Sequence, residues 1–555
     1  MPTLDVSELN VVISVLGAFT ILYGLLSIKI KNVWYLGEAL PAVITGIILG
    51  PVAGRILDPS RWGSAVEGQK EAITLGLTRV IIGVQLLIAG YQLPAKYQRI
   101  RWKEMFICLI PNMTLMWLMT SACVVAAIPN LSFLQALVIG SCVTCTDPIL
   151  SQAIAKGPFA DKYVARHLRE IISSEAGMND GFGFPFLMLG VYLMRHAHGP
   201  QPTAESSAHE AAVIARSGDV GRQGGGPGVA IGNWVLETWI YYILMGAAYG
   251  IVVGYTSLHA LRYCLRRKWI DSESYLLFPT ALGLFIIGTC GCIGTNDLLA
   301  CFFAGNALNW DGGYLAETEA RHDEVNSCVD VILNFGGFMY IGVIFPWDEF
   351  NQPHVTGITY PRLVLLGVLV LLLRRIPSIL LLYKLMPKVC KNWKEALFMG
   401  YFGPIGIGAV FYVEHTRHLF PEIGHGDAEE TQLMLAIGPT VYWLVLFSIV
   451  IHGLSIPALN AVYKMKGVRP VVDPSGPVEV RPLSANMALP KNSSVHGRRR
   501  SIIMYNRFSR SRYSEQIGWE LPVTRDEAER SKRNSWERPK PPTFQLQSMN
   551  GDQTQ

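Results

Sequence analysis

The stretch SSEAGMNDGFGFPF, from Ser173 to Phe186, places Glu175, Asn179 and Asp180 inside an apolar segment. With ARHLREII before it and LMLGVYLM after it, the pattern predicts one long apolar helix. An ionised side chain at the centre of a bilayer costs at least about 2.5–3.5 kcal/mol. Proteins keep such groups chiefly where they bind ions, relay protons or pair with one another. The stretch therefore predicts a functional site within a membrane.

Composition supports the membrane interpretation. Of the 555 residues, 50% are hydrophobic and 16% are charged, and the mean hydropathy is +0.30. Soluble domains carry about 25% charged residues, and a single soluble core stops growing near 250–300 residues. Here apolar runs, separated by short loops, approach the roughly 20 residues that cross a bilayer. We expect an all-α polytopic membrane protein with about thirteen transmembrane helices.

The thirteen expected spans alternate with loops of contrasting charge. The spans are approximately 10–28, 33–54, 72–93, 104–128, 131–155, 167–194, 231–260, 274–292, 294–309, 325–346, 358–384, 394–413 and 431–460. Lysine and arginine gather in the loops after spans 1, 3, 5, 7 and 11, which the positive-inside rule places in the cytoplasm. The N-terminus is then outside and the C-terminus inside. The acidic loop after span 9 disagrees, and a miscount of spans 8 and 9 is the simplest explanation.

Two segments fall outside the predicted bundle. Residues 197–229 are polar and Gly-rich, which is typical of a flexible loop. Residues 464–555 are rich in Ser, Arg, Pro and Asn, so we expect a largely disordered, basic cytoplasmic tail after a membrane domain of residues 1–463. Its stretch VHGRRRSIIMYNRFSRSR can contact anionic lipids of the inner leaflet at roughly 1 kcal/mol per basic residue.

Span 5 carries the first buried charge, in SCVTCTDPIL. Pro148 has no amide hydrogen and disfavours helix at Asp147, so the helix breaks mid-membrane. Transporters bind ions at such breaks, with half-helix ends facing a cavity. Alternatively, Asp147 caps the second half-helix by accepting hydrogen bonds from its free amides. The two interpretations are compatible, and Thr146 adds a hydroxyl beside the carboxylate.

The opening stretch carries the second site. Glu175 and Asn179 share one helix face, whereas Asp180 points roughly 100° away from Asn179. Carboxylate and amide oxygens suit a hard monovalent cation, and shielding from bulk water also lets a carboxylate hold a proton. One group can then exchange a proton for a cation. The alternative is a buried structural network, which we favour more for Glu175 than for Asp180.

Spans 9 and 11 carry the other charges. In GTNDLLACFFAGN, Asp297 beside Asn296 lies either within the membrane or at a helix start, where it would cap the helix. In LLLRRIPSILLLYK, Arg374 and Arg375 interrupt an apolar run and need a carboxylate or carbonyl partner. We propose Glu175 as that partner.

Span 12 contains GYFGPIGIGAVFY, a second candidate helix break. Spans 5–6 and spans 11–12 would then occupy corresponding places in two halves of the chain. Two interrupted helices in matching positions are the pattern of an inverted-repeat transporter in which the broken helices cross.

The ordered set of motifs TDP, SSEAGMNDGFGFPF, RR.P, EALFMGYFGPIGIGAVFY and SIVIHGLSIP, with LIAGYQLP at Leu87–Pro94, resembles the cation/proton antiporter superfamily. The tail and NDGFGFPFL resemble the fungal plasma-membrane alkali-metal-cation/proton antiporters. By resemblance, Asp180 and Asp147 are the Na⁺-binding carboxylates, with Asn179 and Thr146 as further ligands. The resemblance also implies a structural pair of Glu175 with Arg375, or with Arg374. Asp297 and Asn296 stand where fungal members tend to have two acids.

The resemblance implies a secondary antiporter, not an enzyme, that exchanges cytoplasmic Na⁺, Li⁺ or K⁺ for external protons. Alternating access, a homodimer at the plasma membrane, and a role in salt tolerance and pH homeostasis would follow. No cofactor and no nucleic-acid partner are expected. The alternatives are a K⁺-selective antiporter of an internal membrane, a cation channel, and an intramembrane aspartyl protease that pairs Asp147 with Asp180.

Overall fold

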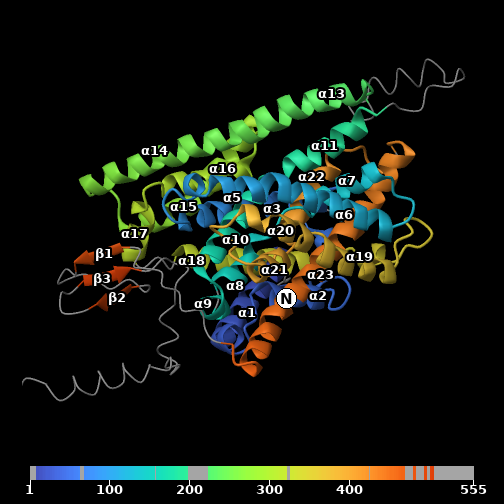
Figure 1. Ribbon diagram of the computed structural model, residues 1–555. Coiled ribbons are helices and arrows are strands. Elements are labelled where there is room, and N and C mark those ends of the chain that lie inside the picture. Colours follow the sequence, from blue (N-terminus) through green and yellow to red (C-terminus); the bar gives the residue numbers. More distant parts are fainter. Residues whose placement is uncertain are drawn as a thin grey trace, which may run out of the picture. The chain divides into compact units, whose positions relative to one another are not determined.

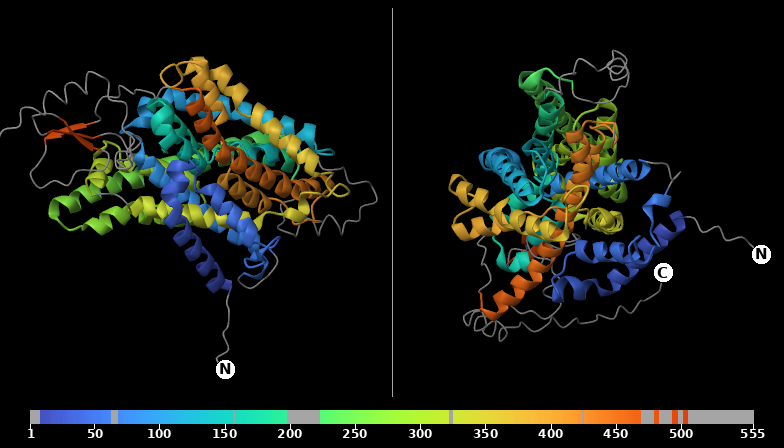
Figure 2. Two further views of the ribbon diagram at one scale, coloured as in Figure 1. Left: turned by 90° about the horizontal axis from the view of Figure 1, so that it is seen from below. Right: turned by 90° about the vertical axis from the view of Figure 1, so that its right-hand side faces the viewer.

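Helices make up nearly all of the described protein, which we analyse as a computed structural model (Figures 1 and 2). The structure describes residues 8–62, 68–156, 158–197, 223–321, 325–423 and 425–468, and three short segments, 479–482, 493–496 and 501–504. The all-α fold class predicted from the sequence is confirmed. The predicted loop 197–229 falls mostly outside the described residues.

The helices of the first half are α1 (Glu8–Ile28), α2 (Ala39–Leu49), α3 (Gln69–Gln92), α4 (Tyr97–Ile100), α5 (Trp102–Ile107), α6 (Met113–Ala127), α7 (Phe133–Cys142), α8 (Pro148–Lys156), α9 (Pro158–Tyr163), α10 (Arg166–Asn179), α11 (Phe184–Arg195) and α13 (Gly226–Asn233). Those of the second half are α14 (Met245–Arg267), α15 (Ser272–Ile293), α16 (Asp297–Leu308), α17 (Gly313–Ala320), α18 (Val325–Ile344), α19 (Tyr360–Leu373), α20 (Ile376–Leu382), α21 (Trp393–Tyr401), α22 (Ile407–Arg417) and α23 (Ala428–Met465).

Each of the thirteen predicted spans falls on one or more of these helices. Within the described residues, eight helical segments are long and apolar enough to cross a bilayer. The other five spans fall on α2, α7–α8, α10–α11, α16 and α21–α22, which are shorter or interrupted. The hydrophobicity of the sequence identifies these segments as spans. In the interrupted ones, proline or glycine removes or weakens helical hydrogen bonding.

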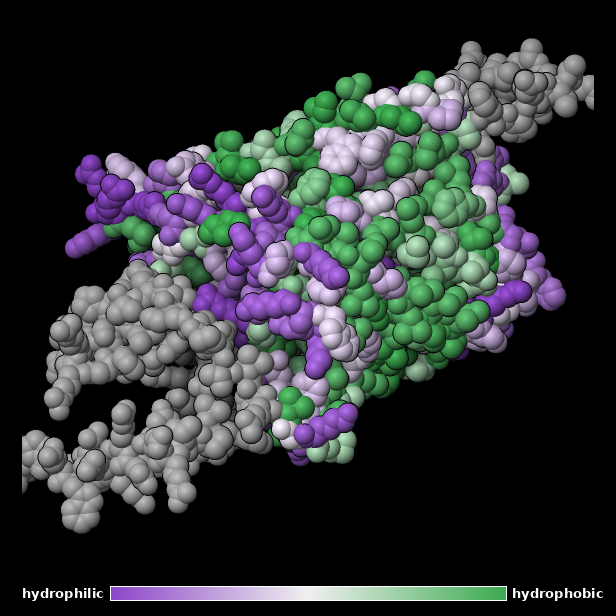
Figure 3. All heavy atoms as spheres, viewed as in Figure 1, coloured by the Kyte–Doolittle hydropathy of each residue, from purple (hydrophilic) through white to green (hydrophobic). Residues whose placement is uncertain are grey.

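The surface of the bundle is apolar where lipid would surround it. On the face shown in Figure 3, hydrophobic residues form a broad band, and hydrophilic residues gather toward its two ends. Large apolar side chains such as Leu25, Leu236 and Val252 are more than half exposed. A soluble monomer rarely exposes such extended apolar surface, whereas a bilayer covers it.

Spans 8 and 9 fall on two separate helices, α15 and α16, of which α15 alone is long enough by length and composition to count as a candidate span in the described residues. The acidic loop after α16 lies at the same end of the bundle as the basic end of α14, because Arg262 of α14 forms an ion pair with Asp311. The acidic residues of this loop therefore accompany a basic cluster. Charge counted loop by loop misses such a pairing between loops.

The stretch 173–186 is not one continuous helix. Helix α10 ends at Asn179 and α11 begins at Phe184, with residues 180–183 forming a turn. Pro185 cannot donate to the Gly181 carbonyl, and the Asn296 side-chain amide donates to it instead, at 2.6 Å. Tyr412 likewise donates its hydroxyl to the Asp180 carbonyl at 2.6 Å. Polar side chains from α22 and the start of α16 thus support the interruption.

Part of the predicted tail has regular structure. Strands β1 (Glu479–Pro482), β2 (Ser493–His496) and β3 (Ser501–Met504) form an antiparallel sheet in the order β1-β3-β2. The central pairs are Val480 with Ile503 and Val495 with Ile502, and β-branched residues favour strands. The expectation of a largely disordered tail leaves room for such short segments. The rest of the tail after residue 468 lies outside the described residues.

Glycines bring α16 into backbone contact with helices on two sides. Gly246, Gly250 and Gly254 of α14 face α16, and a Cβ atom at Gly250 would lie 2.2 Å from the Ala300 carbonyl oxygen. On the other side of α16, a Cβ at Gly305 would lie 2.2 Å from the Leu87 carbonyl oxygen of α3. Small residues at such spacing let membrane helices approach closely. The result is a tightly packed group of α3, α14 and α16.

Replacing Gly250 with Val should destabilise the protein, because the backbone of α16 leaves no room for the side chain. Overpacking of this kind costs about 1–3 kcal/mol. The measurement is the thermal unfolding midpoint of the purified protein in detergent. Gly288→Val on α15 is the control, since nothing lies within 4 Å of a Cβ at Gly288. Equal midpoints for the two variants would contradict the packing argument.

Candidate ion-binding site

The two broken helices meet at their breaks. Residues 143–147 separate α7 from α8, and residues 402–406 separate α21 from α22. The Asp147 amide donates to the Pro404 carbonyl at 2.8 Å, which joins the two unwound segments directly. The crossing of discontinuous helices predicted from TDP and GPIGIG is confirmed. It brings four half-helix ends together in the interior of the bundle.

Asp147 binds both amino ends at this crossing. Its Oδ1 accepts the Leu150 amide of α8 and its Oδ2 accepts the Ile407 amide of α22, each at 2.8 Å. A carboxylate is favourable at a helix N-terminus, where free N–H groups carry partial positive charge. The capping role left open by the sequence is therefore present at two helices. Asp147 is almost completely buried.

Arg374 binds the opposite, carbonyl ends. Its guanidinium donates to the Cys145 and Gly403 carbonyls at 2.7 Å, and to the Thr144 carbonyl at 3.2 Å. These carbonyls end α7 and α21, where helix dipoles carry partial negative charge. One carboxylate and one guanidinium thus compensate the four helix ends. Arg374 is buried, and these three hydrogen bonds go to backbone carbonyls rather than to Glu175.

Glu175 pairs with Arg375. The two guanidinium nitrogens donate to the two carboxylate oxygens at 2.8 and 2.7 Å, in a bidentate arrangement. The Arg375 Nε also donates to the Met399 carbonyl at 3.0 Å, and both side chains are buried. The sequence left both Arg374 and Arg375 open as partners of Glu175, and Arg375 is the one that pairs with it. The pair links α10 to the bend between α19 and α20.

Asp180 differs from the other buried acids. It is 0% exposed, and neither of its carboxylate oxygens has a hydrogen-bond partner in the part of the chain that the structure describes. Buried polar atoms are rarely left unsatisfied in folded proteins. A carboxylate in this position can gain a bound proton or a bound cation without losing an existing hydrogen bond. Asp180 is therefore the best-placed group for exchange.

Three glycines of GPIGIG make room for the charged groups. A Cβ atom at Gly406 would lie 1.9 Å from Asp147 Oδ2, and one at Gly408 would lie 2.9 Å from Asp180 Oδ1. At Gly403 the Cβ would lie 2.3 Å from the Arg375 side chain. Because Gly406 and Gly408 are two residues apart, the crossing brings both aspartates to one short segment. The Cys145 thiol also borders Gly408, beside Asp180.

Thr146 and Asn179 bind each other. The Asn179 amide donates to the Thr146 hydroxyl at 2.7 Å, and its carbonyl oxygen accepts the Thr146 backbone amide at 3.1 Å. This reciprocal pair attaches the unwound segment of α7–α8 to α10. The Thr146 hydroxyl oxygen keeps a second lone pair for a cation. In this arrangement Asn179 positions Thr146 and thereby orients the segment that ends at Asp147.

Asn296 and Asp297 have separate structural partners. Asn296 caps α16 by accepting the Leu299 amide at 2.9 Å, while its own amide supports the turn at Gly181. Asp297 forms an ion pair with Arg79 of α3. Sequence reasoning missed Arg79, although an arginine within an apolar span needs a carboxylate or carbonyl partner. The hydrogen bonds and the ion pair described for Asn296 and Asp297 thus go to Leu299, Gly181 and Arg79.

Replacing Gly406 with Ala should impair the site more than replacing Gly408 with Ala. The new methyl group would overlap Asp147 Oδ2 at position 406, whereas at 408 the contact with Asp180 is a full ångström longer. Forcing extra volume into a packed site costs about 1–3 kcal/mol, which corresponds to an equilibrium shift of about five- to 150-fold away from the correctly arranged site. Cation-dependent proton flux per folded protein measures the effect. The reverse order of severity would contradict it.

Crossed, interrupted helices with buried charges at the crossing define the class of ion-coupled secondary transporters. Comparison with solved structures agrees on the fold. The sodium proton antiporter MjNhaP1 from Methanocaldococcus jannaschii, at pH 8, is 14% identical with a TM-score of 0.54, over 80% of this chain and 100% of that one.

A profile described as "Sodium/hydrogen exchanger, transmembrane" matches residues 15–461. The Na(+)/H(+) antiporter 2 of Zygosaccharomyces rouxii is 34% identical over 469 residues, which cover 82% of this chain and 53% of that protein. The Na(+)/H(+) antiporter of Schizosaccharomyces pombe is 31% identical, covering 84% of this chain and 93% of that one. The chain spans about half the length of the Zygosaccharomyces relative. It belongs to the transmembrane sodium/hydrogen exchanger family.

Proposed function

We propose that the chain is a secondary antiporter that exchanges cytoplasmic Na⁺ for external protons, with Asp180 as the group that holds one or the other. The observation that carries the proposal is the complete burial of Asp180 together with the absence of hydrogen-bond partners for its oxygens in the described residues. Family membership and the names of the relatives support the same choice of ions.

The physical basis is competition for one negative charge. Deprotonated and without a cation, Asp180 would be an isolated charge in a low-dielectric interior, which is strongly unfavourable. Binding either a proton or Na⁺ neutralises it. Movement of the site between the two sides of the membrane is then favoured only in a loaded state, which couples the two fluxes. Hard oxygen ligands for Na⁺ are available from Asp180, Thr146 and the unwound backbone.

Neighbouring groups favour transport over proteolysis. Both Asp147 oxygens already accept backbone amides, so Asp147 is engaged at the helix ends rather than sharing a proton with Asp180. An aspartyl protease needs two carboxylates that share a proton. We further propose the orientation inferred from loop charge, a homodimer, the plasma membrane as location, and contact of the basic tail with anionic lipids. Li⁺ and K⁺ are the other candidate cations.

The deciding experiment uses the purified full chain in vesicles with a preset pH gradient and an internal pH indicator. Addition of NaCl should dissipate the gradient, whereas choline chloride should not. Parallel additions of LiCl and KCl report selectivity, and a larger response to KCl would favour the K⁺-selective alternative. Cation flux that follows voltage without any proton movement would indicate a channel. No response to any alkali cation would overturn the proposal.

A further inference from the structure

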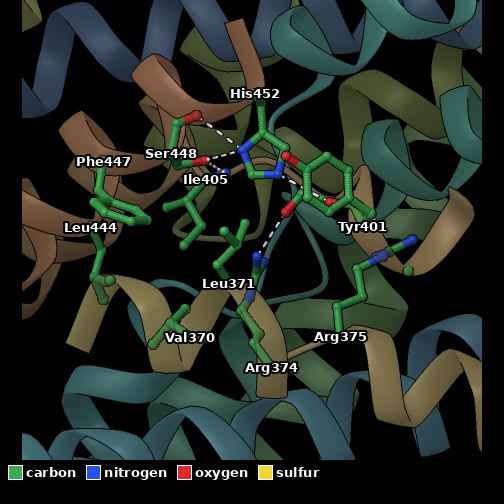
Figure 4. A pocket seen from close by; sticks show the side chains of 13 residues that line it. Val370, Leu371, Arg374, Arg375, Tyr401, Ile405, Leu444, Phe447, Ser448 and His452 are labelled. Carbon is green, nitrogen blue, oxygen red and sulfur yellow. Dashed lines mark hydrogen bonds between the residues drawn. The ribbon is translucent and has the colours of Figure 1, made fainter. Parts of the chain in front are cut away.

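Helix α23 forms hydrogen bonds to the second helix break, the unwound segment 402–406. Ser448 and His452 lie one turn apart on that helix, and both are buried. Figure 4 shows them beside Tyr401 and Ile405, which stand at the two ends of the unwound segment. Arg374 approaches the same segment from the other side of a small cavity (Figure 4).

Two polar contacts connect α23 to this segment, and two more join Ser448 to His452 within α23. The Ile405 amide donates to the Ser448 hydroxyl oxygen at 2.7 Å. The Ser448 hydroxyl and His452 Nδ1 lie 3.1 Å apart, and Nδ1 is 2.9 Å from the Ser448 carbonyl. His452 Nε2 lies 3.0 Å from the Tyr401 carbonyl oxygen. One serine and one histidine thus bind both ends of the break.

The chemistry of a neutral imidazole fits these contacts as a directed chain. Nε2–H donates to the Tyr401 carbonyl, and the lone pair of Nδ1 accepts the Ser448 hydroxyl proton. The Ser448 oxygen in turn accepts the Ile405 amide. Helix α21 ends at Tyr401, whose carbonyl also accepts the Gly403 amide at 3.0 Å, so Nε2–H is the second donor to this oxygen. This tautomer serves the Tyr401 carbonyl and the Ser448 hydroxyl; the 2.9 Å contact between Nδ1 and the Ser448 carbonyl then joins two acceptors and is not a hydrogen bond.

The segment held in this way carries the atoms that contact the first break. Between Tyr401 and Ile405, the Gly403 carbonyl accepts Arg374 and the Pro404 carbonyl accepts the Asp147 amide. Two residues beyond Ile405, the Ile407 amide donates to the Asp147 carboxylate. Functional groups work best when surrounding hydrogen bonds fix their geometry. A displacement of Tyr401 or Ile405 would therefore move the donors that surround Asp147.

A cavity of about 20 Å³ adjoins this arrangement, which is room for about one water molecule. Arg374, Ser448 and His452 are among the residues that line it. The Arg374 Nε has no hydrogen-bond partner within the described residues. The segment therefore adjoins a small cavity on the side of α23, where Ser448 and His452 bind it by hydrogen bonds.

We propose that His452 is a positioning residue of the transport site, acting through Tyr401, Ser448 and the 402–406 segment on the geometry around Asp147. The inference rests on the proposed function, because Asp147 is taken there as part of the cation site. A residue that orients ligands changes cation affinity, whereas a residue that only stabilises the fold changes the amount of active protein.

The test compares His452→Ala, His452→Gln and Ser455→Ala in reconstituted vesicles. Loss of one buried hydrogen bond that orients the site should raise the KM for Na⁺ about tenfold, with Vmax per folded protein changed less than about twofold. Glutamine can donate to Tyr401 and accept from Ser448, so His452→Gln should recover most of the affinity. Ser455 contacts the hydroxyl of the same Tyr401 at 2.5 Å, not its carbonyl, and its variant should keep the original KM.

An unchanged KM in His452→Ala, or an equal increase in Ser455→Ala, would overturn the inference. If His452→Ala does not fold, Ser448→Ala removes the partner of Ile405 and should raise the KM in the same way. Thermal stabilisation of the purified protein by NaCl is measured in parallel, since it reports Na⁺ binding without transport. Na⁺-dependent stabilisation that shifts in His452→Ala, in a protein without exchange, would support the positioning role and reject the antiport function.

Discussion

Replacing Asp180 with Asn should reduce cation-driven proton flux to the level of protein-free vesicles, while the protein accumulates and folds normally. Asparagine has nearly the same shape but can neither release a proton nor supply the negative charge that Na⁺ requires. The substitution breaks no hydrogen bond of the carboxylate within the described residues, so the fold should tolerate it. Flux in vesicles and the unfolding midpoint in detergent measure the two outcomes.

The matched control is Asp311→Asn, which removes a carboxylate from an exposed ion pair with Arg262. Exposed pairs contribute about 0–1 kcal/mol, so this variant should exchange ions normally. Exchange by Asp180→Asn at the rate of the starting protein would reject Asp180 as the exchanging group. A variant that fails to fold would instead show that the carboxylate is held by contacts other than those described.

Replacing Arg375 with Met should destabilise the protein by about 3–5 kcal/mol, because Glu175 would remain buried with its charge uncompensated. The bidentate bonds at 2.8 and 2.7 Å would both be lost. The expected result is a large fall in the unfolding midpoint and in the yield of monodisperse protein. The double variant Glu175→Gln with Arg375→Met, which removes both charges, should recover a substantial part of the loss.

The double variant distinguishes a structural role of the Glu175–Arg375 ion pair from a role in ion binding. Recovery means that the cost of the single change comes mainly from an isolated charge, as is usual for buried pairs. If Arg375→Met is as stable as the starting protein, the pair has no structural role and Glu175 becomes a candidate for ion binding. Exchange by the double variant would further show that the pair serves the fold and not the transport chemistry.

Much of the architecture follows from local rules. The break before Pro148 was predictable because proline lacks an amide hydrogen and disfavours helix in the preceding residue. The second break was suggested by glycine and proline together. Their meeting point was expected only from the symmetry of inverted repeats. Distances such as that between the Asp147 amide and Pro404 depend on packing between segments far apart in sequence.

Roles within the site were harder to predict than its location. Arg374 and Arg375 are adjacent in sequence, and only the bend after α19 directs one to carbonyls and the other to Glu175. The turn after Asn179 depends on Asn296 and Tyr412, more than 100 residues away. Pro185 is a local sequence signal for that turn, and Arg79, an arginine within an apolar span, is a sequence signal for the partner of Asp297.

The glycine contacts of α16 limit which parts of the protein can shift. Sliding α16 by one turn along α3, or by a fraction of a turn along α14, where the glycines repeat every four residues, would bring side chains into places where the backbones now touch. We therefore expect α3, α14 and α16 to keep their register and to move as one unit. Any motion of this unit relative to Asp180 would change the contact at which the start of α16 rests on Gly181, where a Cβ would lie 2.6 Å from the Leu299 amide nitrogen.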